Sequence, residues 1–105
     1  MSGQHPHGRL SLLWEEHMRA PFPGGFRGVD FDGVDLVLLD ADVAGLTRLE
    51  LDGGLGHEVV ANLWACIAGL DRVLPLIDDD YCTVCFTRLR RMAALAAARH
   101  TPGAN

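Results

Sequence analysis

The chain has 105 residues, a length typical of one domain, and 49% of them are hydrophobic while 22% are charged, as in a folded globular protein. Its 14 acidic residues outnumber 9 basic ones, and the formal net charge is -5. This acidic balance argues against non-specific binding to nucleic acid or to an anionic membrane surface. Every basic residue is Arg, which excludes a mechanism that needs a lysine Schiff base.

The N-terminal sequence and the cysteine content predict a cytoplasmic protein. No uninterrupted apolar run reaches the length of about 18 residues that spans a bilayer, and MSGQHPHGR lacks the apolar segment of a signal peptide. Three cysteines, an odd number, do not suggest a disulfide framework. We therefore expect neither a membrane nor nucleic acid as a partner.

One domain is expected over residues 9–98, preceded by a disordered N-terminus at 1–8 and followed by a frayed C-terminal tail at 99–105. Within residues 9–20 the apolar side chains recur at helical spacing, with charged side chains between them. The turn-rich sequence APFPGG follows. The domain should therefore begin with a short amphipathic helix.

Residues 27–31 and 34–40 are predicted to form an antiparallel β-hairpin. Apolar residues alternate with Asp in the first segment, and they alternate again in the second. Asp32 and Gly33 between them are a residue pair that a type I′ turn favours. The second segment is apolar on both faces, so it should be the more buried strand.

This turn also predicts the register of the hairpin, with Phe31 opposite Val34 and Asp30 opposite Asp35. Two carboxylates facing each other destabilise a sheet unless water or a cation lies between them. An exposed polar face is the preferred interpretation, and a cation site is the alternative.

Asp40 and Asp42 should end the second strand, and LDGGLG at 51–56 is a clear break. Residues 43–51 are the uncertain element: a short helix is favoured, although TRLEL alternates well enough for a strand.

A broad apolar stripe from Val59 to Leu74 predicts a long helix that ends near Pro75, and Asp78 is the expected N-cap of the last helix. Two long helices joined by a few residues should pack as an antiparallel hairpin. The predicted fold is therefore α+β: an N-terminal helix, a β-hairpin, a short uncertain element, and a C-terminal helical hairpin that covers one face of the strands.

The segment DLVLLDADVAGLT contains a pattern with a catalytic precedent. An apolar strand ending in Asp40 and Asp42 resembles the first motif of haloacid-dehalogenase-type phosphatases, which implies a nucleophile, a general acid/base and magnesium. The fit is poor, because the fourth residue after the first Asp is Ala44 and the strand belongs to an antiparallel hairpin. Only Asp78 to Asp80 could supply the downstream magnesium ligands, and they are better explained as a helix start.

Cys82 and Cys85 form a CxxC pair, with Cys66 and His57 as further ligands in a hypothetical zinc site. The pair lies within an apparent helix, on its apolar stripe, and buried thiols suit that position without a metal. We expect no metal and no cofactor. His17 has no sequence neighbour that would make it a general base, and it is interpreted as a surface or helix-end residue.

The order WEE, APFP, RGV, DGVDLVLLDAD, followed by LDRVLPLI, resembles a group of small uncharacterised actinobacterial proteins. That resemblance implies no activity and no site. We expect a non-enzymatic interaction or regulatory protein that binds a protein partner or a second copy of itself. The alternative is a small magnesium-dependent phosphohydrolase that uses Asp40 and Asp42.

Overall fold

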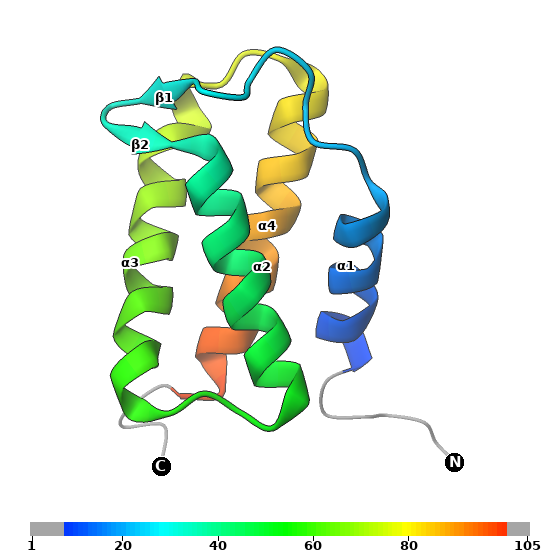
Figure 1. Cartoon of the computed structure of the whole chain (residues 1–105), viewed down its shortest axis with the longest axis vertical. Helices are drawn as coiled ribbons and strands as arrows, with labels where there is room; N and C mark the ends of the chain where they lie inside the picture. The colour runs from blue at the N-terminus through cyan, green and yellow to red at the C-terminus, as the bar shows by residue number, and fades with distance from the viewer. Residues whose placement is uncertain (1–7, 101–105) are drawn as a thin grey trace.

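The computed structural model describes residues 8–100, and in them the protein is mostly helical with one small antiparallel sheet (Figure 1). The elements in chain order are α1 (Gly8–Arg19), β1 (Asp30–Phe31), β2 (Val34–Asp35), α2 (Leu36–Asp52), α3 (His57–Val73), the 3₁₀ turn η1 (Leu74–Leu76) and α4 (Asp80–Ala98). This confirms a fold that is broadly α+β. Most of the predicted disordered N-terminus, and residues 101–105 of the predicted tail, lie outside the described residues.

The β-hairpin has the predicted turn and register. Asp32 and Gly33 have φ angles of 54° and 80°, and positive values at both turn positions are characteristic of type I′. The antiparallel partners are Asp30 with Asp35 and Phe31 with Val34. Each strand is only two residues long, so the hairpin closes one end of the helical bundle and forms no extended layer.

Of the two predicted strands, 27–31 is confirmed only at Asp30–Phe31 and 34–40 only at Val34–Asp35. The prediction of a strand is wrong from Leu36 on, because α2 begins there. The carboxylate of Asp35 accepts a hydrogen bond from the backbone N–H of Leu38 at 3.0 Å, which makes Asp35 the N-cap of the helix. The uncertain element at 43–51 is part of this same helix. The buried residues of α2 recur at spacings of three and four: Leu36, Leu39, Val43, Leu46, Thr47 and Glu50.

The four helices of the described chain run alternately up and down, and α2 and α4 lie at the centre. The short helix α1 packs on α2 and α4 from one side, and α3 packs on the same pair from the other side (Figure 1). The core between them contains mostly aliphatic side chains, together with Phe86 and Met92. Each of α2 and α4 therefore buries side chains against three neighbours: the other central helix, α1 and α3.

The C-terminal helices α3 and α4 pack against each other and run in opposite directions. The predicted N-cap was wrong by one residue. It is Asp79, and not Asp78, whose carboxylate accepts from the backbone N–H of Cys82 at 2.9 Å. Pro75 lies in η1, the turn that joins the two helices.

A buried carboxylate joins the opposite end of the bundle. Glu50 is only 2% exposed, and its two oxygens lie 2.7 Å from Nε2 of His100 and 2.9 Å from Nε of Arg99. It also accepts a hydrogen bond from the backbone N–H of Leu55 at 3.2 Å. Glu50 therefore ties the α2–α3 turn to residues just after α4, residues that the sequence had placed in the tail.

We expect Glu50→Ala to lower the free energy of unfolding by about 2–3 kcal/mol, because it leaves buried donors without an acceptor. This loss is smaller than the loss expected on breaking a fully buried ion pair, because Arg99 is partly exposed. Urea denaturation checks this. Asp52→Ala is the control, because Asp52 forms an exposed pair with Arg48 and should change stability by less than about 1 kcal/mol. Equal losses in the two variants would contradict the prediction.

Candidate functional site

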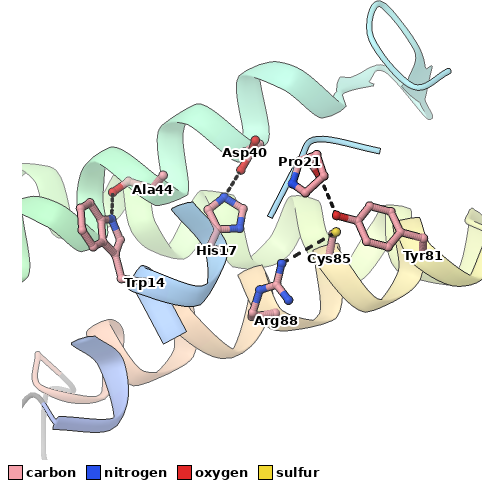
Figure 2. Close-up of polar contacts among 8 residues, drawn as sticks. All are labelled: Trp14, His17, Pro21, Asp40, Ala44, Tyr81, Cys85 and Arg88. Atoms are coloured by element: carbon pink, nitrogen blue, oxygen red, sulfur yellow. Dashed lines mark hydrogen bonds and ion pairs between the residues drawn. The ribbon is translucent and has the colours of Figure 1, made fainter. Parts of the chain in front are cut away.

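A pocket of about 180 Å³ lies between α1, the loop after it, α2 and α4. Its residues come from three separate segments of the chain: His17, Met18, Ala20, Pro21, Phe22, Pro23, Asp40, Cys85, Phe86, Arg88 and Leu89. Polar groups gather along one part of this lining, and Figure 2 shows how they lie. The pocket thus combines apolar walls with a small number of polar side chains, which is the usual make-up of a ligand site.

His17 and Asp40 face each other across the α1–α2 contact, with Nε2 of His17 2.5 Å from Oδ1 of Asp40 (Figure 2). A carboxylate can only accept, so Nε2 carries the proton. Nδ1 of His17 is buried and has no hydrogen-bond partner within residues 8–100. One turn earlier, the indole N–H of Trp14 donates to the carbonyl oxygen of Ala44 at 3.3 Å, which aligns the two helices.

Arg88 brings a positive charge to the same pocket, and its side chain is only 11% exposed. Its Nη2 donates to Sγ of Cys85 at 3.8 Å, and its Nη1 lies 3.8 Å from a carboxylate oxygen of Glu16, a side chain that is 60% exposed. Nε of Arg88 is buried without a partner among the described residues. This guanidinium is therefore largely removed from water but only weakly paired.

The loop between α1 and β1 forms the outer wall of the pocket. The hydroxyl of Tyr81 donates to the carbonyl oxygen of Pro21 at 2.7 Å and so attaches the loop to α4 (Figure 2). The rings of Phe22 and Phe86 meet edge to face, with their centroids 6.2 Å apart. The loop is therefore held against α4 by one hydrogen bond and one aromatic contact.

Asp40 and Asp42 do not lie at the end of a strand, because both are inside α2. Side chains two positions apart on a helix point about 200° apart around its axis. Accordingly, Asp40 lines the pocket just described, whereas Asp42 lines a separate groove between α2 and α3. The arrangement therefore does not bring the two carboxylates to one phosphorus atom.

The predicted cysteine ligands are also separated. Cys82 and Cys85 are buried on α4, Cys66 is buried on α3, and all three are free thiols. His57 is exposed at the start of α3, at the far end of the helical hairpin from Cys82. Within residues 8–100, no three His, Cys, Asp or Glu side chains are grouped so that they could hold a metal ion.

A second feature lies on the other side of the α2–α4 pair. The groove between α2 and α3, about 520 Å³ in volume, has Leu39 and Gly69 among its lining residues. Beside it, the segment His57–Leu76 is long and apolar enough to cross a membrane by length and composition alone, and 33% of its 18-residue apolar window is buried inside the protein. Its exposed side chains include Trp64, which is 43% exposed. Much apolar surface therefore remains uncovered on α3.

No protein-family model, curated protein or solved structure matches this chain. Its function must therefore be argued from the geometry of these two surfaces.

Sequence analysis named Asp40 but missed its partner His17, and it missed the roles of Tyr81 and Pro21. These groups meet only through the packing of α1 and α4 on α2. The signal that could have paired His17 with Asp40 is the antiparallel alignment of α1 with α2, and that alignment is invisible while 34–40 is interpreted as a strand.

We expect the Cys82 thiol to be inert in the folded protein. Burial, followed by the charge of Asp79, raises the pKa of Cys82 to about 11. At pH 8 this lowers the thiolate fraction from about a quarter, for an ordinary pKa of about 8.5, to about one in a thousand. Alkylation by iodoacetamide, followed by mass spectrometry, should be slow in a Cys66→Ala, Cys85→Ala background and fast in urea.

Val84→Cys in a background without the native cysteines is the matched control, because Val84 is an exposed position two residues further along α4. Its thiol should react rapidly in the folded protein. Comparable rates for Cys82 and for the control would show that the thiol of Cys82 is not protected.

Proposed function

We propose that this is a non-enzymatic interaction or regulatory protein of the cytoplasm, and that it associates with a second copy of itself through the outer face of α3. One observation carries the proposal: the apolar helix α3 leaves Trp64 and three alanines, Ala61, Ala65 and Ala68, exposed on its outer face. Apolar surface left in water is a free-energy cost that association removes.

The shape of this face suits another helix. Ala61, Ala65 and Ala68 are exposed at spacings of four and three, so they form a flat strip along α3. Small side chains allow a second helix to approach closely. Trp64, next to the strip, offers the kind of large aromatic side chain that dominates many protein interfaces.

The charges near α3 favour a protein partner over a lipid surface. Helices that lie on membranes carry Lys and Arg along their polar face. Here α3 offers only Arg72, which pairs with Asp32 of the hairpin, and it also carries the acidic Glu58 and Asp71. The net charge of -5 further disfavours anionic lipid and nucleic acid.

The phosphohydrolase alternative loses its main support, because Asp40 and Asp42 point into separate hollows. Asp40 is also engaged by His17. We therefore assign no catalytic residue and propose no cofactor.

Analytical ultracentrifugation should find a dimer, and Ala65→Glu should convert it to a monomer, since it places a charge in the strip. Ala41→Glu is the matched control, because Ala41 is an exposed alanine within α2, away from the strip. It should leave the dimer intact. A wild-type chain that stays monomeric at every concentration contradicts the proposal, and so does a monomer that floats with phosphatidylcholine vesicles, which would identify a bilayer as the occupant instead.

A further inference from the structure

We propose that the pocket between α1, α2 and α4 binds a small monocarboxylate with an apolar body, and that Arg88 is the counter-ion of its carboxylate group. This site lies on the α1 side of the bundle, opposite the face of α3 that we assign to self-association. The two proposals therefore rest on different residues.

The argument starts from the weak pairing of Arg88. A guanidinium has five N–H donors, and buried charges are normally paired and hydrogen-bonded. Within residues 8–100, the side-chain hydrogen bond and ion pair of this guanidinium are with a thiol at 3.8 Å and with an exposed carboxylate at 3.8 Å. Both distances exceed those of charge-assisted hydrogen bonds, which are about 2.7–2.9 Å. Arg88 therefore has unused capacity for an anion.

The other charged groups of the pocket do not meet this need. The carboxylate oxygen of Asp40 that is closest to His17 lies 2.5 Å from its ring nitrogen, so Asp40 is already engaged. Glu16 stands near the guanidinium, but its side chain is mostly in water. An anion from solution can occupy the space next to Arg88 without displacing a strong internal pair.

The size and walls of the pocket define the rest of the ligand. A volume of about 180 Å³ slightly exceeds the engineered cavity of about 150 Å³ that binds benzene in another protein. Met18, Phe22, Phe86 and Leu89 supply apolar and aromatic surface. A ligand with one small ring or a short branched chain attached to its carboxylate fits this lining.

The charge balance favours a carboxylate over a phosphate. A planar carboxylate matches the fork of a guanidinium. A phosphate group carries up to two negative charges, and the pocket offers one arginine together with the carboxylate of Asp40. The apolar walls also leave few donors for the additional oxygens of a phosphate.

The test titrates the full-length protein with three probes, benzoate, benzamide and inorganic phosphate, followed by calorimetry and by NMR. Benzoate should bind in the millimolar range and at least tenfold more tightly than benzamide, which has the same shape without the charge, because hydrogen bonds to charged groups are the stronger ones. It should also bind more tightly than phosphate. The NMR shifts should centre on Phe22 and Leu89 and leave Trp64 unchanged.

Arg88→Met removes the charge at similar length and should weaken benzoate binding by about tenfold to hundredfold. Arg91→Met, an exposed arginine on the same helix, is the matched control and should bind like the wild type. Arg88→Lys keeps the charge but loses the fork, so its affinity should be intermediate.

Three results would overturn the proposal, and two of them need no variant: equal binding of benzoate and benzamide, tighter binding of phosphate than of benzoate, or an Arg88→Met protein that retains wild-type affinity. The dimer test on α3 is independent of all three.

Discussion

The hydrogen bond from the backbone of Leu38 to the carboxylate of Asp35 determines where the strand ends and where α2 begins. The type I′ turn places Asp35 at the end of the second strand, and its side chain then satisfies one of the free N–H groups of the first helical turn. Because the chain becomes helical at Leu36, α2 gains the length to contact both α1 and α3. The pocket on the α1 side and the groove on the α3 side both depend on this change from strand to helix at Leu36.

The sequence next to Asp35 explains why the strand predicted over 34–40 was wrong from Leu36 on. The run from Leu36 to Leu39 is apolar at every position, so it fits a buried strand and a buried helix equally well. Leu36, Leu39 and Val43 follow the helical period, and the core is built on that period. The turn, its register and the long C-terminal helices were predictable because local residues specify them. The N-cap at Asp79 was missed by one position, since three consecutive Asp residues offer similar caps.

Contacts between distant helices were beyond the reach of one sequence. His17 pairs with Asp40, and Glu50 pairs with Arg99 and His100, across separations that only the packing of the helices brings together. Neither set of contacts has a local pattern, because each partner is an ordinary polar residue within a helix or just after one. Sequence analysis therefore identified Asp40 as a residue of interest for a reason that the structure does not support.

Two departures from well-matched packing bear on binding. Arg88 is a largely buried cation without a close anion, and α3 is an apolar helix that the monomer covers only in part. Each costs stability in the isolated chain, whereas Glu50, a buried charge with a structural role, has all its partners at hydrogen-bond distance. Natural proteins tolerate such local mismatches mainly where binding supplies the missing partner. This contrast is the reason to look for a ligand beside Arg88 and not beside Glu50.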